Sequence, residues 1–238
     1  MTGWRGWRHF VLPVTLVATA CSTTAESATI VPATSASTLV TTTTTTSTVD
    51  LSTTTVPSRR IHEQSWTPFA TVGPLTLVHP SSRVEMVAFH ESNHDGARQQ
   101  EPLPTAASPV TLESRERDTT SRGAADIVAD PEMAIRAPVT GRVKRGGSYV
   151  LYCDNRDYFL VIEPDGRPGW EVKVLHIAGL LVRTGDRVEA GVTVIAPAPT
   201  RLPFESQVDE VSADPPWPHV HIEVVDPSIP DRPSGRRC

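Results

Sequence analysis

The chain has 238 residues, a formal net charge of −5 at pH 7 and only 5% aromatic residues. This mildly acidic balance provides no basic surface for a phosphate backbone, so it argues against nucleic acid as a partner.

The first 21 residues have the features of a secretion signal. Arg5 and Arg8 precede an apolar run, Phe10 to Ala20, that is too short to span a bilayer. The run ends in Ala18-Thr19-Ala20-Cys21, which resembles a bacterial lipobox, where Cys21 would receive the lipid and become the new N-terminus. The alternative is ordinary cleavage at the Ala-x-Ala site. We therefore expect an extracytoplasmic protein, anchored to the membrane at the bacterial cell surface through Cys21 or else secreted.

Residues 22–58 are dominated by Thr and Ser and include the unbroken run Thr41 to Thr46. Such a tract buries too little apolar surface to fold, so we expect a disordered linker. As a random coil it would reach roughly 35 Å, and about 120 Å if fully stretched. The folded domain is expected over residues 59–238, with its core at about 120–225.

Short apolar runs separated by Gly and Pro predict an all-β domain, either two packed antiparallel sheets or a small barrel-like sandwich. Segment 97–121 is charged and without pattern, which indicates a long surface loop. Asp165-Gly166 is the clearest hairpin turn. The predicted strands are Leu75–His79, Val84–His90, Ala134–Arg136, Gly141–Lys144, Tyr149–Tyr152, Tyr158–Ile162, Glu171–His176, Val192–Ala196 and Val220–Val225.

Two histidines, His219 and His221, stand at the start of the last predicted strand. Residues at i and i+2 of a strand point to one face of the sheet, so the two rings are expected to converge. His176 precedes them in the chain, and Asp126 lies further upstream. This order of residues resembles the LytM-type, lysostaphin-like zinc endopeptidases, which cut peptidoglycan cross-bridges.

The resemblance covers roughly residues 120–225 and includes the turn segments 137–143 and 185–191. It implies a LytM-like β fold with a groove for peptidoglycan. It also implies that Asp126 and His221 are zinc ligands, and that His176 and His219 handle protons and steady the attacking water.

The resemblance breaks at position 122, where the family has its first zinc histidine and this chain has Arg122. Catalytic zinc normally takes three protein ligands, and a guanidinium cannot lose its proton to become one. Zinc binding by Asp126 and His221 alone is therefore doubtful. We expect Arg122 to occupy the vacated position and to pair with Asp126.

A second metal motif, His90-Glu91-Ser92-Asn93-His94, matches His-Glu-x-x-His. On a helix it would make a zincin, with Glu91 as general base and Glu113 or Glu116 as third ligand. Ser92-Asn93 and the Asp95-Gly96 turn disfavour a helix, however. If the segment is instead a strand, His90 or His94 is a candidate replacement for the missing LytM ligand.

Cys153 and Cys238 are the cysteines other than Cys21, and an oxidising compartment favours a disulfide between them over two free thiols. A biotinyl- or lipoyl-like domain is disfavoured because both lysines, Lys144 and Lys173, lie inside predicted strands.

Two functions follow from these patterns. The favoured one is a degenerate, non-catalytic module that binds peptidoglycan or regulates another cell-wall hydrolase. The alternative is an active zinc metalloendopeptidase that cleaves peptidoglycan, with a replacement ligand for the lost histidine.

Overall fold

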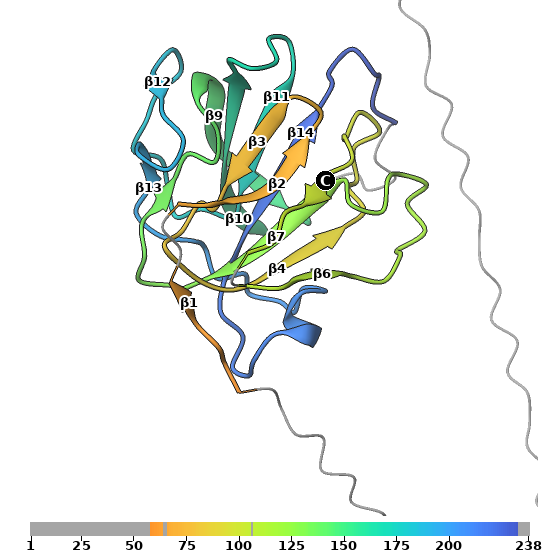
Figure 1. Cartoon of the computed structure of the whole chain (residues 1–238), viewed down its shortest axis with the longest axis vertical. Helices are drawn as coiled ribbons and strands as arrows, with labels where there is room; N and C mark the ends of the chain where they lie inside the picture. Colours follow the sequence, from red (N-terminus) through yellow and green to blue (C-terminus); the bar gives the residue numbers. More distant parts are fainter. Residues whose placement is uncertain (1–57, 64–65, 106, 233–238) are drawn as a thin grey trace, which may run out of the picture. The chain divides into compact units, whose positions relative to one another are not determined.

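The computed structural model describes residues 58–63, 66–105 and 107–232 (Figure 1). The predicted signal peptide, Cys21 and the Thr/Ser-rich linker up to residue 57 lie outside the described residues. Within the described part the fold is almost entirely β, as predicted, and one 3-10 turn, η1 (Asp209–Val211), is its only helical element. No helix in this part has the length and apolar character needed to cross a bilayer.

The largest sheet is open, and its strands pair antiparallel apart from one parallel pair, β4 with β6. Its order along the sheet is β1 (His62–Glu63), β4 (Arg83–His90), β7 (Ala124–Ala129), β14 (His219–Val225), β11 (Glu171–Leu175), β10 (Asn155–Pro164), β9 (Gly141–Leu151) and β12 (Arg187–Val188), with β6 (Pro109–Thr111) beside β4. Two smaller sheets have the orders β3 (Leu75–Val78), β2 (Pro68–Val72), β5 (Glu101–Pro102) and β13 (Val194–Ala196), β8 (Ile135–Arg136).

One face of the large sheet packs into the main hydrophobic core, and the other face carries polar side chains together with a smaller apolar cluster that includes Ala88 and Val128. On β14, Val220, Ile222 and Val224 belong to the main hydrophobic core, whereas His219 and His221 alternate with them. Because side chains alternate along a strand, the sequence pattern places the core on one face and the histidines on the other. The β2–β3 hairpin adds its own apolar residues to the same core.

Several parts of the fold differ from the sequence prediction. Strands β1, β2 and β12 were not expected, and the strands expected at 141–144 and 149–152 form one continuous strand, β9. The segment expected to be a loop, residues 97–121, contains β5 and β6. The sequence prediction also missed β7, whose six residues, Ala-Ala-Asp-Ile-Val-Ala, are all buried. Half of this strand is Ala, a residue with little strand preference, so β7 forms because it lies between β4 and β14.

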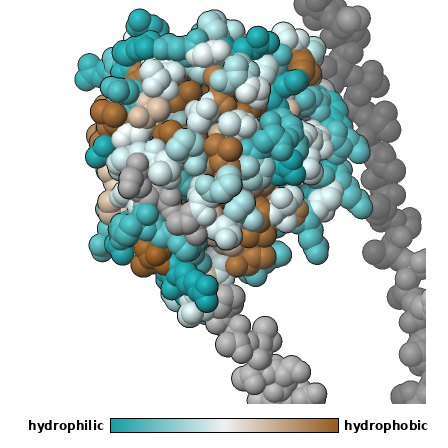
Figure 2. Space-filling view, viewed as in Figure 1, coloured by the Kyte–Doolittle hydropathy of each residue, from teal (hydrophilic) through white to brown (hydrophobic). Residues whose placement is uncertain are grey.

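The surface seen in Figure 2 has apolar patches separated by hydrophilic side chains rather than one continuous apolar area. This face therefore offers no large apolar docking surface of the kind that marks protein–protein interfaces.

Candidate metal centre

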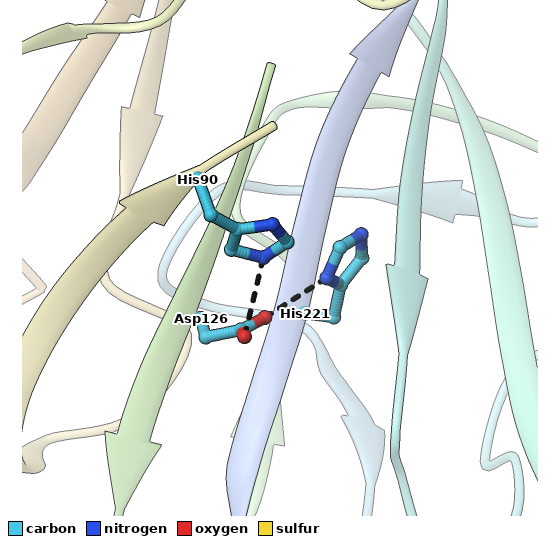
Figure 3. A group of neighbouring side chains, drawn as sticks. All are labelled: His90, Asp126 and His221. Carbon is cyan, nitrogen blue, oxygen red and sulfur yellow. Dashed lines mark hydrogen bonds and ion pairs between the residues drawn. The ribbon is translucent and has the colours of Figure 1, made fainter. Parts of the chain in front are cut away.

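Adjacent strands of the large sheet bring three side chains of metal-binding type together. Asp126 on β7 lies directly opposite His221 on β14 in the strand register. His90 is the last residue of β4, on the other side of β7. Figure 3 shows both imidazole rings pointing at the Asp126 carboxylate.

The distances fit a shared site. Nε2 of His90 lies 3.2 Å from one Asp126 oxygen, and Nδ1 of His221 lies 2.9 Å from the other. One ligand atom from each of the three residues lies within 4.8 Å of the other two. Two imidazoles and one carboxylate are a ligand set that catalytic zinc uses, with a further position left for water or substrate.

The hydrogen bonds of His90 favour a cation at this point. Its Nδ1 lies 2.8 Å from the backbone oxygen of Glu91, which can only accept, so the ring donates there. In a neutral ring Nε2 then carries a lone pair, and this buried atom has no hydrogen-bond partner in the described part of the chain. A lone pair facing a carboxylate oxygen is repulsive unless a proton or a metal ion lies between them. The residues therefore fit a metal ion.

Each ring nitrogen of His221 faces a carboxylate, Nδ1 that of Asp126 and Nε2 that of Glu223. Burial alone would lower its pKa, but the hydrogen bond to Asp126 and the nearby negative charge of Glu223 outweigh burial and raise the pKa to about 9. Glu223 lies 3.9 Å from Nε2 of His221 and is itself anchored by Lys173 at 3.0 Å and by the Ser92 hydroxyl at 2.5 Å. Carboxylates that orient the second nitrogen of a ligand histidine are typical of metal sites.

The charge of Asp126 is stabilised by its surroundings. Burial raises the pKa of this carboxyl group, but the neighbouring His90 and His219 and the hydrogen bond from His221 hold it well below its usual range. Asp126 is therefore a buried anion, whose charge is balanced by the protonated His221 or by a bound metal ion.

The other two predicted histidines lie beside this group. The His176 ring packs edge-on against His219, with 5.1 Å between ring centroids, and lies 5.9 Å from the His221 ring. Nε2 of His219 is 3.8 Å from Asp126. Burial lowers the pKa of His219 to about 4, so this ring is neutral at pH 7.

Arg122 does not occupy the site, so the expected pairing with Asp126 is wrong. Its guanidinium donates to the backbone oxygen of Gln100 at 2.9 Å and to the Glu101 carboxylate at 2.7 Å. These partners direct the Arg122 side chain to the 100–101 segment. The position that Arg122 was expected to fill is taken by His90.

The zincin alternative is also wrong. The segment that follows His90 is a loop rather than a helix, and His94 is not part of the three-residue group. The Glu91 carboxylate accepts hydrogen bonds from the Ser114 hydroxyl and from the backbone amides of Arg115 and Arg117. Glu91 therefore anchors the 114–117 loop and does not act as a base beside a metal.

Asp126 and His221 of the ligand group, together with His176 and His219, line a groove with a cavity volume of about 830 Å³. It is a mixed polar and apolar cleft whose volume lies within the range of small-molecule binding sites. Its lining includes Asp126, His176, His219, His221, Glu223 and Lys173 from the sheet region, Arg115 and Arg117 from the 114–117 loop, Tyr149, Leu151 and Tyr152 from the β9–β10 hairpin, and Leu202, Phe204 and Glu205 from the segment before η1.

Sequence reasoning did not single out two buried carboxylates near the histidines. Glu223 was detectable, because it follows His221 by two residues and so shares its strand face. Asp157 on β10 carries no local signal, and only the fold brings it to His176.

Cys153 is disulfide-bonded. Cys238, its expected partner, lies outside the described residues, so that pairing stays a prediction.

Comparison of the chain with known protein families and with curated proteins found no match. What the site does is therefore argued from its own geometry.

Proposed function

We propose that this protein is an extracytoplasmic zinc-dependent peptidase that cleaves peptides of peptidoglycan, the activity implied by its LytM-type sequence resemblance. The observation that carries this proposal is the convergence of His90, Asp126 and His221 within 4.8 Å of one another. Three ligands are the number that a catalytic zinc site requires.

The position of His90 changes the preference between the two sequence-based functions. The non-catalytic interpretation rested on a site with only two ligands and an arginine in the third position. Arg122 instead hydrogen-bonds to Gln100 and pairs with Glu101, and His90 lies beside Asp126. The lack of a third ligand therefore no longer argues against catalysis.

A zinc ion held by His90, Asp126 and His221 would supply positive charge that polarises a peptide carbonyl and makes water more acidic. His176 lies next to the ligand group and is available to take a proton from the attacking water and to return it to the leaving amine. His219 is neutral at pH 7 and can donate a hydrogen bond to the substrate oxygen, where negative charge develops. The groove would hold the peptide on both sides of these residues.

The proposed location agrees with the proposed substrate. A lipid anchor at Cys21, or secretion after signal cleavage, would place the enzyme outside the membrane, and the Thr/Ser-rich linker would let it reach the cell wall. Peptidoglycan is then the partner that the protein meets.

The test is to purify the chain, measure its bound metal by elemental analysis, and incubate it with cell walls while released peptides are followed by mass spectrometry. The proposal predicts one zinc per chain and peptide release that stops on chelation and returns with zinc. His221→Ala serves as the inactive control. Binding to walls without cleavage, in protein that contains zinc, would instead establish the regulatory module. Stoichiometric iron in place of zinc would contradict the proposed chemistry, because two histidines and one carboxylate can also hold iron.

A further inference from the structure

A buried carboxylate outside the ligand group contacts His176. Asp157 lies on β10 and is 1% exposed, so its charge is almost completely removed from water. An ionised carboxylate in such a place is costly unless it is paired and hydrogen-bonded. The residues that pair with Asp157 therefore indicate its role.

Oδ2 of Asp157 accepts three hydrogen bonds, and two of them come from His176. Nδ1 of the His176 ring lies 2.7 Å from this oxygen and the backbone nitrogen of His176 lies 3.2 Å from it. The Tyr149 hydroxyl donates to the same oxygen at 2.7 Å. These bonds hold both the ring and the backbone of His176.

The backbone of His176 needs such restraint. Its φ is +62°, in the left-handed region that residues other than glycine seldom adopt. A conformation of this kind is strained and persists only where the surroundings enforce it. The bond from the His176 backbone amide to Asp157 is one of the enforcing contacts.

The bond to Nδ1 also determines the chemistry of the ring. When Nδ1–H donates to a carboxylate, Nε2 of a neutral imidazole carries the lone pair. A histidine side chain in water favours the opposite tautomer, with the proton on Nε2. The contact therefore selects the form of His176 whose Nε2 can take a proton.

We propose that Asp157 is a positioning residue, which fixes His176 in the Nδ1–H tautomer and orients its Nε2 for proton transfer, with Tyr149 holding the Asp157 carboxylate in place. The use of that Nε2 in catalysis rests on the proposed peptidase function. In that reaction Nε2 takes a proton from water as the new C–O bond forms, and gives it to the amine nitrogen as the C–N bond breaks. A purely structural role would need only an acceptor for the His176 backbone amide and would not select the tautomer of the ring.

The first test does not depend on activity. The tautomer of His176 is read from its ¹⁵N shifts by NMR on the full chain at neutral pH, in the wild type and in variants. We expect Nδ1–H in the wild type and in Asp157→Asn, whose amide oxygen still accepts, and a change to Nε2–H in Asp157→Ala. Wild-type protein with the proton on Nε2, or Asp157→Ala with the proton still on Nδ1, would overturn the proposal. If Asp157→Ala does not fold, the wild-type tautomer alone decides.

The second test is kinetic. Asp157→Ala is expected to lower kcat at least about 10-fold, since a general base contributes at least that much, while KM and zinc content stay unchanged. Glu171→Gln is the matched control, because it also neutralises a buried carboxylate, but one that pairs with Arg145 and Lys144. An equal loss of kcat in Glu171→Gln would reduce the effect to general destabilisation and overturn the assignment. Zinc-loaded wild type with the expected tautomer but no peptide release would refute the peptidase function and leave the Asp157–His176 arrangement standing.

Discussion

At the scale of single residues, the third position of the site is filled from another strand. The family pattern has a histidine four residues before the aspartate, on the same segment, whereas here His90 comes from β4, next to β7. Since β4 and β7 pair antiparallel, a residue at the end of β4 reaches the same carboxylate. The candidate metal centre therefore draws its three side chains, two imidazoles and a carboxylate, from three adjacent strands.

His90→Ala should abolish tight zinc binding. Loss of contacts around ligands already weakens metal binding 10- to 100-fold in typical sites, so loss of a ligand should weaken it at least about 100-fold. Isothermal titration of zinc into metal-stripped protein measures this affinity. His94→Ala is the matched control, because it removes the other histidine of the same motif, and it should bind zinc as the wild type does.

Arg122→His should leave zinc affinity unchanged, contrary to what the sequence pattern alone suggests. The Arg122 side chain points to Gln100 and Glu101, away from the three ligand residues. An imidazole at position 122 would therefore point away from the metal as well. The same titration measures the effect. A clear gain in affinity would mean that position 122 faces the site and that the assignment of His90 is wrong.

At the scale of elements, the sequence shows which face of a strand a residue occupies, but not which strands are neighbours. The even spacing of His219 and His221 was enough to predict that they share a face. Pairing of β4 with β7 depends on contacts between residues far apart in the chain, so the sequence left His90 and His94 as equal candidates. Asp157 was missed for the same reason.

His79, the residue that follows β3, should make the domain acid-sensitive. It is 0% exposed, and neither ring nitrogen has a hydrogen-bond partner among the described residues. Burial lowers its pKa from 6.5 to about 4. The unfolded chain therefore takes up this proton first as the pH falls, so the stability contribution is complete above pH 6.5 and is lost between pH 6.5 and 4.

His79→Leu removes this titration. The free energy of unfolding, measured with urea, should fall less on acidification in the variant than in the wild type, by up to about 3 kcal/mol between pH 7 and 4. Comparing the two proteins cancels the titration of all other groups. If the free energy of unfolding falls equally with pH in the two proteins, His79 is not responsible for the acid sensitivity.

Gly141→Ala should destabilise the large sheet at the start of β9. A Cβ atom at this position would lie 2.2 Å from the backbone oxygen of Glu163 on β10, which cannot move without disturbing the strand pair. We expect a loss of about 1–3 kcal/mol in unfolding free energy, as for other overpacked sites. Gly147→Ala on the same strand is the control, since its nearest contact is at 4.0 Å, and it should be neutral. Equal effects of the two substitutions would contradict this account.

At the scale of the whole molecule, the two faces of the large sheet have different roles. One face packs with the β2–β3 hairpin into the main core, and the other face carries the histidines and the groove. The all-β class was predictable from short apolar runs and turn residues, and it is confirmed. The signal peptide, the lipid at Cys21 and the linker concern residues outside the described part, so they stay predictions.

The account depends on one ion bound by three named side chains. The most direct measurement is a crystal structure of the purified protein with data collected on both sides of the zinc absorption edge. We predict one anomalous peak, bonded to Nε2 of His90, a carboxylate oxygen of Asp126 and Nδ1 of His221. No peak at that point in zinc-supplemented crystals, or a peak that excludes His90, would contradict the account.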